Sequence, residues 1–509
     1  MSHLNGENRY QTKLFNLDER VEPDHIVRII DKFVSILDLE ALGFDKAAPL
    51  PIGRPSYGPG HMLRLYLYGY ESGVRSSRKL ERLAKESLPA MWLMDELTPD
   101  FKTIADFRKD NITSLTEVFY EYGSFLESAG LFGKKAIAID GTKIKADNNK
   151  KTNFSKKKIE SRIRYGKERA AEYLETLREV DSMEEYEAVS EKLVKTEKQL
   201  AKYEKYKETL SETGEGELSE VDPDARLMVN SLNGVDVSYN VQAATDAKNH
   251  LVAEFDVSMN PTDHDQLANM MKKTQETLRK KDIVGIADKG YYNADQLKGC
   301  EGAGAKVVVS RQYSPGEKHK DKSFRLDKFI YDQERDVYTC PIGQILPAHN
   351  SKKAKRRKFF DKTACQNCEH KSQCLSGKTK FRIINRGPDA DLFDRADKMY
   401  MDNLHLYKLR QQIVEHVFGT LKRNMNGGYF LLRTKEKVKC ETSLMLLGYN
   451  LKRSRNALGF EEIMKRLDEY AEKIGRGKAV MTYYLWRKLY DFIKRQIRTW
   501  RYTENLRVA

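Results

Sequence analysis

The sequence lacks any long apolar run. None of its 509 residues belongs to a stretch near the roughly 20 apolar residues of a membrane-spanning helix, and residues 1–16 have no signal-peptide core. Cysteine is scarce as well. The chain has six, four of which cluster, and this excludes a disulfide-stabilised secreted scaffold. We therefore predict a cytoplasmic protein with no membrane partner.

Acidic residues are too few to balance the basic ones. Lys and Arg together number 90 and Asp and Glu 75, which gives a formal charge of +15. A positive balance favours a polyanionic partner, such as nucleic acid, over an acidic small molecule. Because the chain is too long for one ordinary core, we also expect several domains.

The segment AIAIDGTKIKA, residues 136–146, contains the first candidate site residue. Its small and β-branched apolar residues predict a short buried strand that ends at Asp140. A carboxylate in that position is costly unless it is paired or binds a metal. One acid cannot hold a catalytic metal, so the site needs further carboxylates.

A second strand of this kind ends at Asp288, in the segment IVGIADKGYY. The intervening and following patterns predict a hairpin (235–244 and 250–258), a helix (262–278), and, after Asp288, a helix to about residue 302 and a strand (305–310). We expect an α/β fold with a mixed sheet in which the strands ending at Asp140 and Asp288 are neighbours. The two carboxylates would then meet at one edge.

Changes in composition divide the remainder of the chain. The N-terminal helices interleave basic residues with tyrosines, and the charged, proline-free stretch after Asp140 predicts two helices in a hairpin. The predicted parts are an N-terminal helical, DNA-binding domain (1–130), an α/β core in two pieces (131–311 and 401–435), a charged helical hairpin (150–222), a Cys-containing basic insertion (312–400) and a basic helical C-terminal region (436–509). The alternatives are a solvated basic face for the first part and an insertion without chemistry for the hairpin.

Four cysteines stand in the basic insertion. The spacing Cys365-x2-Cys368-x5-Cys374, with Cys340 upstream in Cys-Pro-Ile-Gly, supplies four soft ligands for tetrahedral zinc. A second close pair is missing, so four reduced thiols remain the alternative interpretation.

A third carboxylate, Glu415, lies on a helix predicted from residue 401 to residue 423. Two acids at strand ends and one on a returning helix are the hard oxygen ligands that two Mg2+ or Mn2+ ions require for phosphoryl chemistry. Spacing alone leaves other carboxylates in competition, namely Asp147, Asp246, Asp256 and Asp265.

Several basic and aromatic residues are candidate DNA contacts. The N-terminal helices carry Arg64, Arg75 and Arg78, which are suited to neutralising phosphates. Tyr291 and Tyr292 are candidates for stacking on a displaced base. The alternative for these two tyrosines is that at least one packs under the helix that follows.

The ordered motifs AIDGTKIKA, SYNVQAATD, IADKGYYNADQL and VEHVFGTLKR resemble those of bacterial insertion-sequence transposases of the DDE class. GRPSYGPGHMLRLYLYGY and TIADFRK extend the resemblance to the N-terminal region, and it also takes in the Cys-containing insertion. The resemblance implies a ribonuclease H-like core with Asp140, Asp288 and Glu415 as the acids that hold two Mg2+ (or Mn2+) ions. It also implies a bacterial protein that acts at the nucleoid.

The activity implied is that of an enzyme that binds terminal inverted repeats, cleaves double-stranded DNA at the transposon ends and transfers the 3′-hydroxyl ends to target DNA. A homodimer would hold the paired ends. The alternatives are a structure-selective, metal-dependent nuclease and a non-catalytic DNA-binding derivative, and the intact trio of acids argues against the derivative.

Members of this family often carry Tyr-x2-Arg-x3-Glu-x6-Lys on the last helix. Tyr407 to Arg410 and Glu415 to Lys422 keep these spacings, but Arg410 to Glu415 is one residue too long and Gln411 stands where the Arg is expected. Lys422 lies two helical turns beyond Glu415, so we expect it to reach a phosphate of the bound transposon end.

Overall fold

The computed structural model describes residues 16–48, 56–230, 234–312, 321–349, 355–375 and 379–475. The chain forms two compact units. One unit comprises Met1–Phe132, Leu421–Gly427 and the chain from Cys440 onward, and the other comprises Gly133–Thr420 and Gly428–Lys439. Within the described segments no helix is long and apolar enough to cross a membrane.

The first unit is helical. Its elements are η1 (Leu17–Arg20), α1 (Ile26–Ile36), α2 (Pro59–Glu71), α3 (Ser77–Glu86), α4 (Leu88–Leu93), α5 (Phe101–Asp110), α6 (Ile112–Ser128) and most of α16 (Lys435–Leu458). Local sequence explains where the helices begin: Pro59 is the first residue of α2, and the Asp100 carboxylate accepts the backbone N–H groups of Lys102 and Thr103 at the start of α5.

Residues from the C-terminal part of the chain complete the core of this helical unit. The hydroxyls of Tyr122 and Ser454 are 2.6 Å apart, and the rings of Phe125 and Tyr470 meet edge to face. Residues 460–475 are helical as well. The described part of the predicted C-terminal region therefore shares one core with the N-terminal helices.

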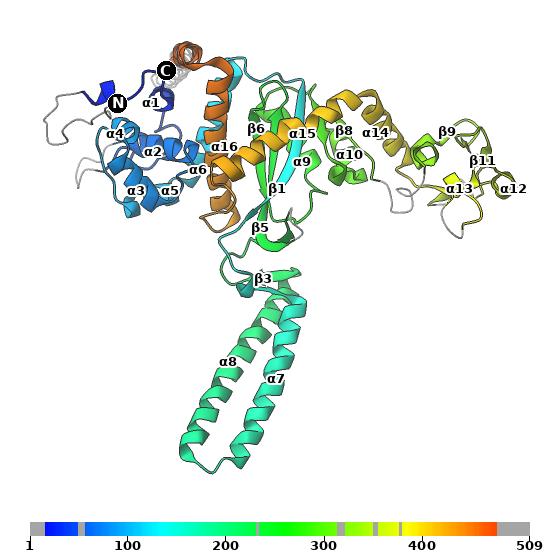
Figure 1. The fold of residues 1–509 in the computed structure, drawn as a ribbon, viewed down its shortest axis with the longest axis horizontal. Coiled ribbons are helices and arrows are strands. Elements are labelled where there is room, and N and C mark those ends of the chain that lie inside the picture. Colours follow the sequence, from blue (N-terminus) through cyan, green and yellow to red (C-terminus); the bar gives the residue numbers. More distant parts are fainter. Residues whose placement is uncertain are drawn as a thin grey trace, which may run out of the picture. The chain divides into compact units, whose positions relative to one another are not determined.

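The second unit contains the mixed sheet (Figure 1). Its strands are β1 (Ala136–Lys145), β4 (Arg226–Val229), β5 (Val235–Asp246), β6 (Val252–Ser258), β7 (Val284–Ala287) and β8 (Lys306–Val309). Their order is β4-β5-β1-β7-β8, and β6 also pairs with β5. β1 is antiparallel to β5 and parallel to β7, so the strands that lead to the two acids are neighbours, as predicted. The predicted end of the first strand at Asp140 is wrong: β1 continues through Asp140 to Lys145, because these residues pair with β5.

Helices cover both faces of this sheet. A Cβ atom built at Gly285 of β7 would lie 2.4 Å from the sulfur of Met271. Helix α9 (Leu267–Thr277), which carries Met271, therefore packs on the face of the sheet to which a side chain at residue 285 would belong. Side chains alternate along a strand, and Asp140 therefore belongs to the opposite face. There it contacts Arg410 of α15 (Leu404–Gly419). A π-helical turn, η6 (Thr420–Asn424), follows α15.

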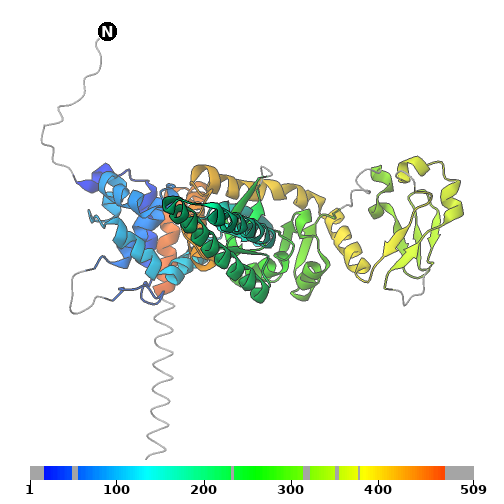
Figure 2. The ribbon, with the colours of Figure 1, turned by 90° about the horizontal axis from the view of Figure 1, so that it is seen from below.

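The charged stretch forms the predicted helical hairpin. Helices α7 (Lys156–Glu179) and α8 (Met183–Thr213) lie side by side in both views (Figures 1 and 2). The Ser182 hydroxyl caps α8 by accepting the Glu185 N–H at 3.4 Å. The elements at the base of the hairpin are η2 (Lys150–Thr152), β2 (Asn153–Ser155) and β3 (Glu217–Ser219).

The remaining elements follow Asp288. Close to the sheet are η3 (Lys289–Tyr291), α10 (Ala294–Gly302) and α14 (Ala390–Asp402). The Cys-containing insertion has η4 (Lys322–Phe324), η5 (Leu326–Lys328), β9 (Ile330–Asp332), β10 (Val337–Thr339), β11 (Ile345–Pro347), β12 (Arg357–Phe359), α12 (Lys362–Gln366), α13 (Lys371–Cys374) and β13 (Ile384–Arg386). It forms a three-stranded and a two-stranded antiparallel sheet around its own small core.

A candidate active site on two neighbouring parallel strands

Asp140 and Asp288 occupy matching positions on neighbouring strands. Ile139 of β1 pairs in register with Ala287 of β7, and each acid is the next residue. Asp140 accepts the N–H of Gly141 at 2.9 Å. The Asp288 carboxylate accepts the N–H of Gly290 at 2.6 Å, so backbone donors orient both acids.

Charge is concentrated around Asp140. The pKa of Asp140 is raised to about 6. Burial is the main cause and the nearby carboxylates of Asp288 and Asp263 add to it, while the Arg410 guanidinium and the Gly141 N–H act in the opposite direction. The Arg410 Nη1 lies 3.2 Å from the Asp140 Oδ2, and the Asp140 side chain keeps 24% of its surface exposed. The negative charges of Asp140, Asp288 and Asp263 lie close together, and a cluster of partly exposed carboxylates of this kind favours the binding of a cation.

Asp263 is a member of this cluster that the sequence analysis missed. It precedes α9, and its Oδ1 accepts the side-chain amides of Asn240 and Gln242 at 2.8 Å each. The Lys143 ammonium lies 3.3 Å away. The polar alternation in SYNVQAATD was the available signal, because Asn240 and Gln242 point to the same face of β5.

Glu415 lies elsewhere on α15. The buried face of this helix is formed by Ile413, Val414 and Val417, whereas the Glu415 side chain is exposed and accepts the Gln411 amide at 2.7 Å. Arg410 is the residue of α15 that contacts Asp140. Across the described ranges, no group of three or more His, Cys, Asp or Glu side chains is arranged to hold a metal ion.

The competing carboxylates all have structural partners. Asp246 is fully buried and accepts the backbone N–H groups of Gly133 and Lys134. The other three are held by Arg433 (Asp147), Lys273 (Asp256) and Asn260 (Asp265). These contacts explain the presence of the acids without a metal, so we do not retain them as site residues.

The two tyrosines after Asp288 have partners within the protein. Tyr291 is fully buried, and its hydroxyl donates to the Gln242 Oε1 at 2.5 Å. Tyr292 stacks on the ring of Phe393 and donates to Asp397 at 2.9 Å. Tyr291 therefore packs inside the protein, which was the alternative prediction for these two tyrosines. We no longer propose that Tyr291 stacks on a DNA base, because no face of its ring is exposed.

The three N-terminal arginines differ in exposure. Arg75 is buried and paired with Glu441 at 2.9 Å, so its side chain has no surface for DNA and we remove it from the candidate contacts. Arg64 is held by Asp31 at 2.7 Å. Arg78 is exposed, with its guanidinium 5.2 Å from the centre of the Phe101 ring.

Two further candidates lie on or after α15. Tyr407 is half-buried, with its ring 6.0 Å from the Arg410 guanidinium and its edge against Tyr400. Lys422 falls within the π-helical turn. Its predicted position, two helical turns beyond Glu415, assumed a continuous α-helix, and the π-helical turn interrupts that helix.

The four cysteines of the insertion come together. Cys340, Cys365, Cys368 and Cys374 all line one cavity of about 30 Å3. None of them forms a disulfide. The sequence prediction that they are neighbours thus agrees with the structure, whereas zinc binding itself stays a prediction.

Two protein families match the chain. The family described as "Transposase domain (DUF772)" matches residues 15–110, in the helical unit, and the family described as "Transposase DDE domain" matches residues 339–455, a range that includes Glu415 and the four cysteines. No curated protein and no solved structure matches the chain. Both matches are to transposase families, and together they support an insertion-sequence transposase of the DDE class.

Proposed function

We propose that this transposase binds the terminal inverted repeats of its element, cleaves phosphodiester bonds at the ends and transfers the 3′-hydroxyl ends to target DNA. The observation that carries the proposal is that Asp140 and Asp288 each follow the last paired residue of the parallel strands β1 and β7, within one cluster of carboxylates. The family matches support a DNA substrate.

Asp140 and Asp288 have the chemistry to hold divalent cations. Their oxygens are the hard donors that Mg2+ and Mn2+ prefer, and the pKa of Asp140, raised by burial and by neighbouring carboxylates, indicates a site where added positive charge is stabilising. When bound, two such ions would activate the attacking oxygen and stabilise the leaving oxygen. Asp140 is our candidate for the bridging ligand.

The third ligand has two candidates. We propose Glu415, on the family motif, although its side chain is paired with Gln411 in this structure. Asp263 is the second candidate, since its charge already acts on Asp140. Glu415→Gln and Asp263→Asn distinguish the two candidates. The substitution that removes the metal ligand should abolish metal-dependent cleavage, and the other should not.

The protein's own cations have separate roles in the proposal. Arg410 pairs with Asp140 and so offsets part of the acidic charge while no DNA is bound. Lys143 does the same for Asp263. Arg78, Lys422 and the helical unit would contact phosphates, and a homodimer would hold two ends together.

The test uses a duplex that contains the terminal repeat found beside the coding region. With Mg2+ we expect nicking at the repeat end, and Asp140→Asn or Asp288→Asn should slow it by at least about 100-fold while DNA binding in a gel shift is retained. Asp282→Asn is the matched control, because Asp282 is an exposed acid with a surface partner, Lys306. Normal cleavage by Asp140→Asn would refute the assignment.

The same reaction separates the alternatives. Joining of the cleaved 3′ end to a second duplex identifies a transposase, whereas cleavage without joining identifies a nuclease. Binding without cleavage, in Mg2+ and in Mn2+, identifies a non-catalytic derivative. The mass of the complex with one and with two ends tests the homodimer.

A further inference from the structure

The Cys-containing insertion has little apolar material to hold it together. In the residues of the insertion that the structure describes, the core has five buried side chains, those of Phe329, Tyr338, Leu346, Phe359 and Ile384, with six partly buried apolar side chains packed against them. Each of the five strands described there is three residues long. A small core on such short strands supplies little stability, and protein segments of this size commonly add a disulfide or a metal.

One cysteine of the insertion stands in a tight turn after β10. The Cys340 carbonyl accepts the N–H of Gly343 at 2.9 Å, and the Cys340 N–H donates to the Gln344 carbonyl at 2.8 Å. Gly343 has a φ of +86°, which favours glycine. The Gln344 N–H then points at the Cys340 sulfur, 3.3 Å away. A backbone donor at this sulfur stabilises a thiolate.

The other three cysteines come from α12, the residues after it, and α13. The sulfur of Cys365 also receives a backbone N–H, that of Arg382, and the nearness of the Cys368 and Cys340 thiols acts on its pKa, which burial raises. Cys374 lies at the end of α13. All four cysteines line the same cavity of about 30 Å3, so two separate segments bring thiols to its walls. Their sulfurs are not arranged around one centre in this structure, so binding a metal requires them to move closer together.

The surroundings of the cavity fit a negatively charged metal centre. Four thiolates around one divalent cation carry a net charge of about −2. Arg382, which is 7% exposed, lines the cavity, and its guanidinium lies 5.1 Å from the centre of the Phe329 ring. A buried guanidinium beside the sulfurs offsets that charge.

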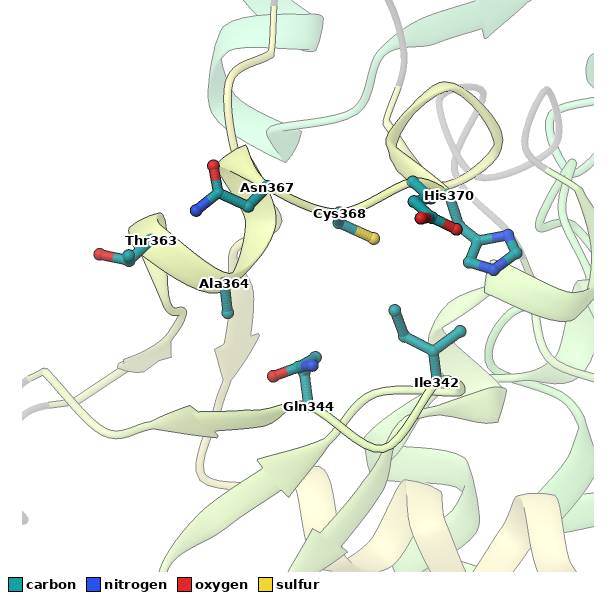
Figure 3. A pocket seen from close by; sticks show the side chains of 8 residues that line it. Ile342, Gln344, Thr363, Ala364, Asn367, Cys368 and His370 are labelled. Carbon is teal, nitrogen blue, oxygen red and sulfur yellow. The ribbon is translucent and has the colours of Figure 1, made fainter.

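An open pocket of about 450 Å3 leads to the same place (Figure 3). The Cys368 sulfur points into it, with His370 to one side and Ile342 and Gln344 across from it. Cys368, Ile342 and Gln344 line both the pocket and the smaller cavity. Solvent and ions therefore reach the Cys368 sulfur from the open pocket, and a metal site requires an entry path of this kind.

We propose that Cys340, Cys365, Cys368 and Cys374 bind one structural zinc ion that ties the turn after β10 to α12 and α13. Binding draws the four sulfurs toward a common centre at about 2.3 Å from the metal, with tetrahedral geometry. The ion then replaces the apolar stabilisation that the short strands lack.

The first test measures zinc in the full-length protein, purified without chelator, by elemental analysis. We expect one zinc ion per chain in the wild type and roughly a tenth of that or less in Cys365→Ser/Cys368→Ser. Cys300→Ala is the matched control, because Cys300 is buried in α10 outside the insertion and should leave the zinc content unchanged.

A second variant covers the case in which the double serine variant does not fold. Cys374→His keeps four zinc ligands and should retain one zinc ion per chain, as well as the sulfur-to-metal absorption of the cobalt-substituted protein. Removing zinc from the wild type should also speed proteolysis within residues 321–386 while the six-stranded sheet of the same unit stays protected. A wild type that binds no zinc after reconstitution, or a double variant that binds as much, overturns the proposal.

Discussion

At the scale of single residues, Gly141 determines how closely the carboxylates approach each other. A Cβ atom built at this position would lie 2.2 Å from the Gln242 Nε2 and 2.5 Å from the Asp263 Oδ1. Any side chain there would displace the group that Asn240 and Gln242 hold in place. Glycine is thus required at position 141 by packing on the face of β1 opposite to the one that carries the Asp140 side chain.

We predict that Gly141→Ala lowers the free energy of unfolding by about 1–3 kcal/mol and reduces cleavage, because Asp263 must move. Thermal unfolding and the nicking reaction measure the two effects. Gly123→Ala in α6 is the control, because no atom outside the helix backbone lies within 4 Å of the added methyl. Alanine is favoured over glycine inside a helix, so this variant should raise the free energy of unfolding by about 0.5–1 kcal/mol. A Gly141→Ala protein as stable as the wild type would contradict the prediction.

At the scale of elements, an ion pair joins β6 to the helix that packs on the sheet. The Lys273 ammonium of α9 lies 2.5 Å from the Asp256 Oδ2, and the two side chains are 33% and 14% exposed. Burial by itself would raise the pKa of Asp256, but the hydrogen bond and charge of Lys273 outweigh it, so the pKa lies below its usual value.

The lowered pKa of Asp256 sets the pH dependence of Asp256→Asn. A carboxyl group whose pKa is lower in the folded state stabilises the fold above its unfolded pKa of about 4 and loses that contribution as the pH falls through its folded pKa. We expect the variant to be less stable than the wild type by roughly 1–2 kcal/mol at neutral pH, with the difference shrinking in acid. Urea unfolding across this pH range measures the difference. The exposed pair of Asp282 and Lys306 provides the control variant Asp282→Asn, and a pH-independent difference would count against our explanation.

At the scale of the whole molecule, the two ends of the chain build one helical unit. A buried ion pair links them. Arg75, two residues before the start of α3, donates to Glu441 of α16, and both side chains are almost fully buried. The Arg75 guanidinium also donates to the Asn426 carbonyl. A buried pair of this kind costs desolvation, but removing one partner costs more, since the other charge is left unpaired.

We therefore predict that Arg75→Met lowers the free energy of unfolding by about 3–5 kcal/mol, measured by denaturant unfolding with circular dichroism. Arg78→Met removes an exposed arginine three residues away and should cost less than about 1 kcal/mol. Adding Glu441→Gln to Arg75→Met should cost little more, because the unpaired acid is removed. Equal losses from Arg75→Met and Arg78→Met would show that the pair is not buried in solution.

Local patterns in the sequence were sufficient for the elements. Periodicity predicted the strand that carries Asp140, the strand that ends just before Asp288, the hairpin of β5 and β6 and the pair α7 and α8, because each depends on residues close together in the chain. It placed the end of the first strand too early, at Asp140, because the polar residues that follow are held in β1 by pairing with β5. The order of motifs indicated the family, and the family matches agree.

Only the tertiary structure decided which side chains meet. The contact of Arg410 with Asp140 depends on the rotation of α15 against the sheet, and the place of Asp263 depends on the loop that enters α9. Arg75 resembled a DNA contact in the sequence, yet packing buries it against Glu441. These contacts join residues from 23 to 366 positions apart, on different elements, so periodicity and spacing contain no signal for them. The strand that carries Asp140, by contrast, was readable from its own few residues.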